Sequence, residues 1–279
     1  MKQYNDKKEE RVADLFLFYF KTRIYVGSMK IIGIIPARWA SSRLPQKALT
    51  FIHGKTMIQR VYERVAQVRE ITQIVVATDH LSIFAHVQGF GGNAVMTSPD
   101  IPSGTDRCAA AMQVVNLDYT PDFIVNIQGD EPLIEPESLR TLIQNLAENV
   151  QIATLVNRVH HLSELTSPNV VKVVVNSKKN ALYFSRQAIP YMRDLPIENW
   201  LDTPYWKHIG IYAFKPDILA EITALPISSL EATEKLEQLR WLEEGYQIKV
   251  IETQYPSIGV DTLSDLEEVS AWIQQLEEN

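Results

Sequence analysis

Short apolar runs alternate along this chain with longer segments in which apolar residues recur at helical spacing. In the first half, the runs that suit buried strands are residues 31–36, 74–77, 93–96 and 123–127. The segments with a helical pattern are residues 56–69 and 105–115. Strand and helix in turn predict parallel βαβ units and a doubly wound sheet.

The second half of the chain is richer in strand-like segments. They occupy residues 152–156, 170–175, 181–184, 209–214 and 248–251. Helical patterns occupy residues 216–223, 230–244 and 263–276. We therefore expect an α/β fold with a doubly wound, mostly parallel sheet and a smaller, strand-rich lobe.

The first 28 residues differ from the rest of the chain. A charged run, 6–11, is followed by a short apolar patch, 15–20, which is too short for a signal peptide or a membrane span. Met29 stands directly before the first strong strand. We expect residues 1–28 to be an extension outside the core and residues 29–279 to form one domain. The alternative is an amphipathic appendage that docks on a partner.

Composition narrows the class of protein. The 279 residues carry a formal net charge of −7, so a polyanion such as DNA would be repelled and nucleic-acid binding is not expected. Cys108 is the only cysteine, which excludes an internal disulfide and a zinc cage built on several cysteines. These features favour a soluble protein of the reducing cytoplasm.

A basic island interrupts this acidic chain. Between Leu15 and Tyr62 there is no Asp or Glu. Arg38, Arg43 and Lys47 lie in one loop after the first strand, and ligands of open α/β sheets bind beyond the carboxyl ends of strands. Arginine forks and nearby hydroxyls grip phosphate oxygens well, so the loop is a candidate phosphate site. A solvated basic surface loop is the alternative.

A second phosphate motif can be rejected. Gly54-Lys55-Thr56 resembles the end of a Walker A loop, but that motif requires a glycine at the position of Leu49. Thr56 is better suited to cap the helix that follows.

Carboxylates follow another predicted strand. Asp130 and Glu131 close the run 123–127 and should lie at the same sheet edge as the basic loop. Asp261 follows residues 258–260, which we expect to form a short strand. One or two carboxylates together with substrate phosphates are a usual site for Mg²⁺. For Asp261 a role in helix capping is the alternative, because Thr262 and Asp265 have capping-box spacing.

A series of motifs resembles the sugar-acid cytidylyltransferases in family order. The motifs are residues 36–47 (PARWASSRLPQK), 76–79 (VATD), 103–107 (SGTDR), 126–132 (NIQGDEP), 181–186 (ALYFSR), 208–212 (HIGIY), 236–240 (LEQLR) and 259–262 (GVDT). The set closely resembles the 3-deoxy-manno-octulosonate cytidylyltransferase family and covers the chain from Met29 onward. Each motif alone is weak, but their number and order make the resemblance specific.

This resemblance implies a fold, a reaction and a set of partners. The fold would be that of the nucleotide-diphospho-sugar transferases, with the smaller lobe serving sugar binding and dimerisation. CTP and 3-deoxy-manno-octulosonate (Kdo) would give CMP-Kdo and pyrophosphate for lipopolysaccharide synthesis, with Mg²⁺ as cofactor and a homodimer as the common assembly. The transfer needs no covalent intermediate, so Cys108 can be an inert helix residue.

The resemblance also implies roles for individual residues. The catalytic residues would be Arg38, Lys47 and Asp130, and the metal ligands Asp130 and Asp261. The nucleotide-binding residues would be Arg38, Ser42, Arg43, Lys47, Thr78, Asp79, Ser103, Gly104, Thr105, Arg107 and Gln128. The sugar-binding residues would be Arg186, His208, Tyr212, Glu237 and Gln238. Without the resemblance, His208 would be read as structural and Glu237 as a solvated helix charge.

Three positions depart from the family pattern. Gln46 stands where the family usually has glycine, which would cost about 1 kcal/mol if the position needs a positive φ. Ile101 and Pro102 precede Ser103 where polar residues are more usual, and Asp106 replaces a common glutamate.

Three other functions compete with this prediction. A cytidylyltransferase for another acidic sugar, of the neuraminic or amino-octulosonic type, is the closest alternative. An inactive nucleotide-binding regulator is disfavoured by the retained Asp130 and Asp261. An NAD-dependent dehydrogenase would require a Gly-x-Gly-x-x-Gly motif after the first strand, and that motif is missing from the sequence.

Overall fold

The computed structural model describes residues 29–40 and 44–278. The predicted extension, residues 1–28, lies outside the described residues, as do Ser42 and Arg43. Among the described residues no helix is both long and apolar enough to cross a membrane.

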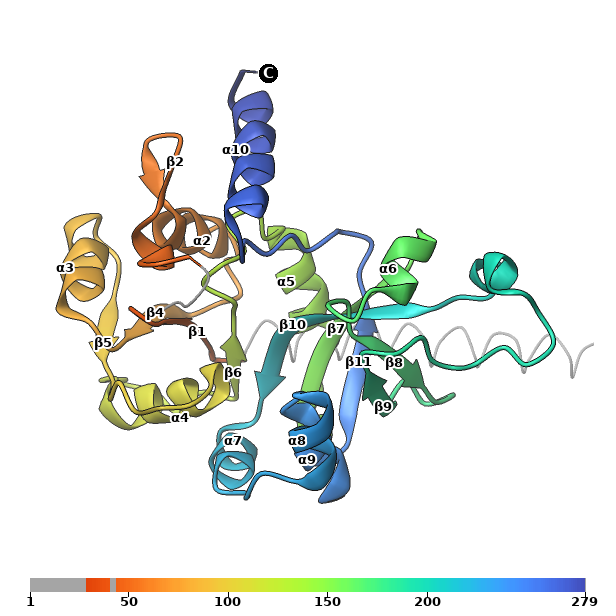
Figure 1. The fold of residues 1–279 in the computed structure, drawn as a ribbon. Coiled ribbons are helices and arrows are strands. Elements are labelled where there is room, and N and C mark those ends of the chain that lie inside the picture. The colour runs from red at the N-terminus through yellow and green to blue at the C-terminus, as the bar shows by residue number, and fades with distance from the viewer. Residues whose placement is uncertain (1–28, 41–43, 279) are drawn as a thin grey trace, which may run out of the picture.

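A mixed sheet forms the centre of the molecule (Figure 1), with its main path in the order β11-β7-β10-β6-β1-β4-β5. The strands of this path are β1 Ile31–Ala37, β4 Gln73–Thr78, β5 Ala94–Met96, β6 Phe123–Asn126, β7 Ile152–Arg158, β10 Trp206–Phe214 and β11 Ile248–Glu252. All neighbours on the path pair in parallel except β10, which is antiparallel to β6 and β7. The predicted doubly wound, mostly parallel sheet is therefore confirmed.

Helices cover both faces of the sheet (Figure 1). One face packs against α2 Met57–Val65, α3 Leu81–Gly89 and α5 Pro136–Gln144. The other packs against α4 Gly104–Val114, α7 Pro216–Thr223 and α9 Gln238–Glu243. Cys108 lies fully buried on α4, as expected for an inert helix residue. Burial of two apolar layers against one sheet supplies the driving force for this arrangement.

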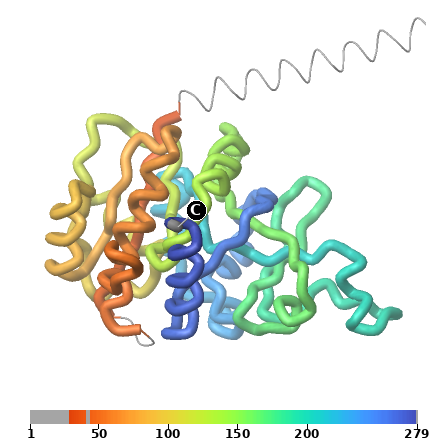
Figure 2. Tube along the Cα trace, turned by 90° about the horizontal axis from the view of Figure 1, so that it is seen from above, coloured from red at the N-terminus to blue at the C-terminus, as the bar shows by residue number. Residues whose placement is uncertain are grey.

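Local signals explain where α2 begins. The Thr56 hydroxyl accepts a hydrogen bond from the Gln59 backbone N–H, which confirms Thr56 as the helix cap. Before it, the short strands β2 Phe51–Ile52 and β3 Lys55–Thr56 form a hairpin. The C-terminal helix α10, Leu263–Glu278, packs with this hairpin and with α2, as the view from above shows (Figure 2).

A smaller lobe lies at the side of the sheet away from α3 (Figure 2). It contains α6 Leu162–Thr166, β8 Lys172–Val175, β9 Ala181–Ser185 and the 3-10 helix η2 Ile197–Asp202. A separate apolar cluster that includes Leu165, Trp200 and Tyr205 packs α6 against η2, whereas β8 and β9 pack into the core on the α4 side of the sheet. The expected strand-rich lobe is present, and it is continuous with the sheet because β8 pairs with β10.

Several sequence-based expectations were wrong in detail. The helix expected over 230–244 is two helices, α8 Ser229–Glu234 and α9, separated where Lys235 adopts a left-handed conformation with φ 55°. Residues 258–260 do not form a strand. The helices α3, α5 and α6 were not predicted.

Candidate active site

A pocket of about 420 Å³ opens beyond the carboxyl ends of β1 and β6. The pocket combines the basic loop with the predicted acidic residues. Its lining is Pro36, Ala37, Arg38, Ala40, Lys47, Ala48, Gly104, Gln128, Gly129, Asp130 and Asp261. The structure thus brings together the predicted site residues Arg38, Lys47, Gly104, Gln128, Asp130 and Asp261. Sequence reasoning missed Gly129, although it belongs to the Gly-Asp pair that the motif contains.

Lys47 joins the basic loop to both carboxylates. Its ammonium donates to Asp130 Oδ2 at 2.6 Å, to Asp261 Oδ1 at 2.9 Å and to the Val260 carbonyl at 2.9 Å. Burial disfavours the charge on Lys47, but attraction to Asp130 and then Asp261 outweighs it and raises the pKa of the ammonium. The expectation that Asp130 and the basic loop share one sheet edge is confirmed.

Asp261 and its neighbours serve two purposes. Thr262 and Asp265 form the capping contacts of α10, since each backbone N–H is accepted by the other's side chain. The Asp261 backbone N–H also donates to Asp265, at 2.8 Å. Asp261 therefore takes part in the helix cap through its backbone N–H, while its carboxylate contacts Lys47 in the pocket.

The donor set around Lys47 suits a hard divalent cation. Two carboxylate oxygens and one carbonyl oxygen already converge on a single positive charge, the Lys47 ammonium. Within residues 29–40 and 44–278, no group of three or more His, Cys, Asp or Glu side chains gathers as a metal site. Two carboxylates plus substrate phosphates are the arrangement expected for Mg²⁺ rather than for a cage made by protein alone.

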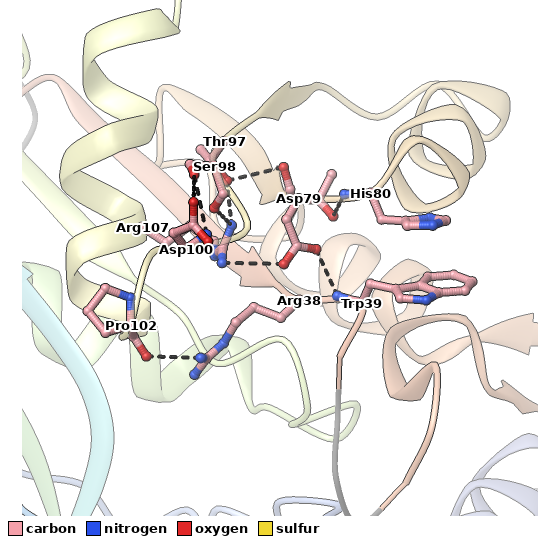
Figure 3. A network of polar contacts seen from close by, with 10 residues as sticks. Arg38, Trp39, Asp79, His80, Thr97, Ser98, Asp100, Pro102 and Arg107 are labelled. Carbon is pink, nitrogen blue, oxygen red and sulfur yellow. Dashed lines mark hydrogen bonds and ion pairs between the residues drawn. The ribbon is translucent and has the colours of Figure 1, made fainter.

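Arg38 reaches across the pocket to the start of α4. Its guanidinium donates to the Pro102 carbonyl at 2.9 Å, as Figure 3 shows. Behind it, the Trp39 backbone N–H donates to Asp79 Oδ1 at 2.8 Å, and the Trp39 ring stacks on His80 with centroids 3.6 Å apart. These contacts fix the backbone that presents Arg38.

Asp79, which contacts the Trp39 backbone, also pairs with Arg107 (Figure 3). Arg107 is fully buried and lies 3.5 Å from Asp79, and it also donates to the Thr97 hydroxyl at 2.6 Å. Thr78 is fully buried at the end of β4. None of these three residues is among those that line the pocket, and their predicted contacts with the nucleotide remain predictions. Asp79 supports the backbone next to Arg38 through its contact with Trp39.

The start of α4 is tied to the start of α9. Ser103 Oγ and Thr105 Oγ1 donate to the two oxygens of Glu237 at 3.0 and 2.8 Å. Arg240 also donates to Glu237, at 2.8 Å. Burial raises the pKa of Glu237 in spite of these partners. Arg240, which sequence reasoning missed, thus fixes a predicted sugar-binding carboxylate against two predicted nucleotide-binding residues.

The reversed strand β10 brings two more of the predicted sugar-binding residues, His208 and Tyr212, to this edge. Tyr212 pairs with Asn126 at the end of β6, so His208 lies beyond that end. Gln128 Nε2 donates to the Gly210 carbonyl at 2.6 Å and connects the pocket to β10. His208 Nε2 lies 3.0 Å from Thr154 Oγ1, whose own hydrogen is donated to the Ile211 carbonyl.

Arg186 and Gln238, the other two predicted sugar-binding residues, are not among those that line the pocket. The Arg186 guanidinium donates to the carbonyls of Glu234 at 2.7 Å and Pro168 at 2.9 Å, and contacts that of Lys235 at 3.3 Å. Gln238 is buried at the beginning of α9. Arg186 thus anchors the segment that separates α8 from α9, and its predicted contact with a sugar carboxylate remains a prediction.

His208 makes the stability of the protein depend on pH. Burial lowers its pKa from 6.5 to about 3, so the folded state stays neutral while the unfolded state gains a proton below about pH 6.5. That stability is fully present above pH 6.5 and is lost as the pH falls toward 3. When the pH is lowered from 7 to 5, the free energy of unfolding should fall by up to about 2 kcal/mol more in the wild type than in His208→Gln. Urea unfolding at both pH values measures this, with the exposed His160→Gln as a control that keeps the wild-type slope.

Gln46, which stands where the family usually has glycine, has a left-handed backbone. Its φ is 54° and its ψ is 31°, directly before the 3-10 helix η1 Lys47–Leu49. Gln46→Gly should therefore raise the free energy of unfolding by up to about 1 kcal/mol, and Gln46→Val should lower it. Urea denaturation at pH 7 checks both changes. A glycine variant less stable than wild type would contradict this account.

Known proteins that resemble this chain carry names that match the function predicted from its motifs. A family model described as cytidylyltransferase matches residues 32–250. A 3-deoxy-manno-octulosonate cytidylyltransferase of Cytophaga hutchinsonii is 50% identical over 242 residues, which cover 86% of this chain and 96% of the relative. The enzyme of the same name from Geobacter sulfurreducens is 47% identical over 86% of this chain and 98% of its own length.

Solved structures extend the comparison to the fold. A CMP:2-keto-3-deoxy-manno-octonic acid synthetase complexed with CTP has a TM-score of 0.81 and 44% identity, covering 88% of this chain and 99% of that one. A 4-diphosphocytidyl-2C-methyl-D-erythritol synthase of Anaerococcus prevotii, at 13% identity and a TM-score of 0.58, shares the fold alone.

The doubly wound sheet and the basic-acidic pocket at its strand ends define a nucleotidyltransferase, and the family match makes it a cytidylyltransferase. Within that class, the chain belongs to the 3-deoxy-manno-octulosonate cytidylyltransferase family. The resemblance drawn from the motifs is therefore confirmed.

Proposed function

We propose that this protein transfers CMP from CTP to Kdo, releasing pyrophosphate and supplying CMP-Kdo for lipopolysaccharide synthesis. The observation that carries the proposal is the convergence of Lys47, Asp130 and Asp261 in one pocket. Relatives about half identical over most of the chain, all with the same enzyme name, support Kdo as the acceptor.

The residues of the pocket suit an in-line displacement. The anomeric hydroxyl of the sugar would attack the α-phosphorus while pyrophosphate leaves, so orientation and charge stabilisation are the tasks of the protein. Arg38 and Lys47 supply positive charge where the phosphates would lie. The acceptor would be bound by His208 and Tyr212 of β10, which lie at the same strand ends, and by Glu237, which contacts Thr105 beside the pocket.

We propose Mg²⁺ as the cofactor, held by Asp130 and Asp261. Its chemistry would be to activate the attacking oxygen and stabilise the leaving pyrophosphate. The support for this is the pair of carboxylates that converge on one positive charge at the pocket.

Pyrophosphate release tests the proposed reaction. The purified protein is incubated with CTP and Mg²⁺ and, in separate reactions, with Kdo, an amino-octulosonic acid or a neuraminic acid. We expect turnover with Kdo and loss of turnover when the metal is removed by EDTA. Turnover with another acidic sugar but not with Kdo would assign the acceptor to the alternative class.

We further propose a homodimer that works in the cytoplasm, where CTP is made. The small lobe presents exposed apolar side chains, with Tyr191 75% and Leu195 43% exposed, which a second copy would cover. Light scattering of the purified protein measures its mass in solution, and a monomer at micromolar concentration would contradict the dimer.

A further inference from the structure

The contacts of Lys47 leave it no donor for a substrate. An ammonium has three N–H bonds, and those of Lys47 point to Asp130, Asp261 and the Val260 carbonyl. Yet Lys47 also lines the pocket, where the proposed function requires it to bind the phosphates of CTP. One ammonium cannot keep all three of these bonds and grip a triphosphate as well.

A divalent cation would compete for the same oxygens. Asp130 Oδ2 and Asp261 Oδ1 are both within 2.9 Å of the Lys47 nitrogen. A metal bound by these two oxygens would lie close to the ammonium, and like charges at such a distance repel strongly in a partly buried site. A metal held by these two oxygens would therefore destabilise Lys47 in its present position.

The exposure and flexibility of Lys47 allow its ammonium to move away from the two carboxylates. Its side chain is 15% exposed and opens on the pocket, whereas Arg107 is fully buried. A lysine carries its charge on a flexible four-carbon stem with three rotatable donors. Loss of the two carboxylate contacts needs only a change in the rotamer of Lys47, with the backbone of η1 in place.

We propose that Lys47 is an exchangeable cation, which neutralises Asp130 and Asp261 in the free protein and is displaced toward the phosphates when a divalent cation binds. The inference rests on the proposed magnesium site and adds the order in which the metal and the phosphates of CTP bind. Entry of the metal creates the phosphate grip, so metal and CTP bind with positive cooperativity through one side chain.

Chemical labelling follows the position of Lys47 directly. The full-length protein is treated briefly with acetic anhydride, and acetylation of Lys47 and Lys55 is measured by peptide mass spectrometry. Lys55 pairs with Glu63 at 2.6 Å and lies outside the pocket lining, so it is the internal control. We expect Mn²⁺, used as the probe, to speed acetylation of Lys47 several-fold and added CTP to slow it again, with Lys55 unchanged. Bound Mn²⁺ that leaves the Lys47 rate unchanged or slows it would overturn the exchange.

The affinity for Mn²⁺ gives a second test that does not depend on turnover. Isothermal titration compares the wild type with Lys47→Met and with the matched control Lys55→Met. Removing the competing ammonium should tighten Mn²⁺ binding about tenfold, whereas Lys55→Met should bind as the wild type does. Equal or weaker binding by Lys47→Met would refute the exchange alone. Failure of the wild type to bind Mn²⁺ even with CTP present would refute the proposed magnesium role as well.

Discussion

Asp130→Ala is expected to lower turnover on the order of 10³-fold while the protein remains folded. Asp130 follows β6 at the pocket floor, where its carboxylate contacts Lys47 at 2.6 Å. The substitution removes one of the two carboxylates that would hold Mg²⁺. It also removes one of the two ion pairs of Lys47 and leaves the pair with Asp261. Pyrophosphate release at saturating CTP, Kdo and Mg²⁺ measures the loss.

The fold should tolerate this change because Asp130 is not part of the core. Its side chain is 32% exposed, and its backbone carbonyl still accepts the Val260 N–H at 2.9 Å. Circular dichroism and the melting temperature should therefore match the wild type closely. The control is Asp118→Ala, an exposed carboxylate that precedes β6 at the opposite end of the strand from Asp130, which should retain full turnover. Turnover by Asp130→Ala near the wild-type rate would refute the metal role.

The order of elements could be predicted because the central strands are buried on both faces. Runs such as 31–36 are continuously apolar for that reason, and a helix between two such runs implies a parallel pair. The place of β10 could not be predicted in this way. It runs antiparallel between β6 and β7, a position set by contacts between segments far apart in the chain.

The break between α8 and α9 shows tertiary contacts overriding local propensity. Residues 230–244 read as one helix because they are rich in Leu and Glu. In the structure, Arg186 donates hydrogen bonds to the carbonyls of Glu234 and Lys235. The hydroxyls of Ser103 and Thr105 donate to the Glu237 carboxylate. These distant partners fix the chain in two short helices, and no periodicity in 230–244 could reveal them.

The same reason limits prediction of the site. Arg38, Lys47 and Asp130 follow strands, so their shared edge could be inferred from the fold class alone. The pairing of Asp79 with Arg107 depends instead on how α4 packs against β4. The motifs that contain these two residues mark both for the nucleotide site, but they do not show that the two side chains pair with each other.

Gly129→Ala is expected to lower turnover about 100-fold, because it displaces Asp130 from Lys47. A Cβ at Gly129 would lie 2.6 Å from the Pro36 carbonyl oxygen and 3.4 Å from Ile35, both on β1. Backbone atoms of a central strand cannot move aside as a flexible side chain could, so the segment carrying Asp130 must shift instead. The free energy of unfolding should also fall by about 1–3 kcal/mol.

The control for this prediction is Gly89→Ala, because a Cβ at Gly89 would meet no atom within 4 Å. That variant should keep wild-type turnover and stability. Steady-state kinetics and urea unfolding of both variants separate a displaced carboxylate from a general loss of folding. If Gly129→Ala is less stable but turns over as the wild type does, the position of Asp130 does not depend on this close approach to β1. If turnover falls while the variant is still folded at the assay temperature, the missing side chain at residue 129 sets the position of the candidate metal ligand next to it.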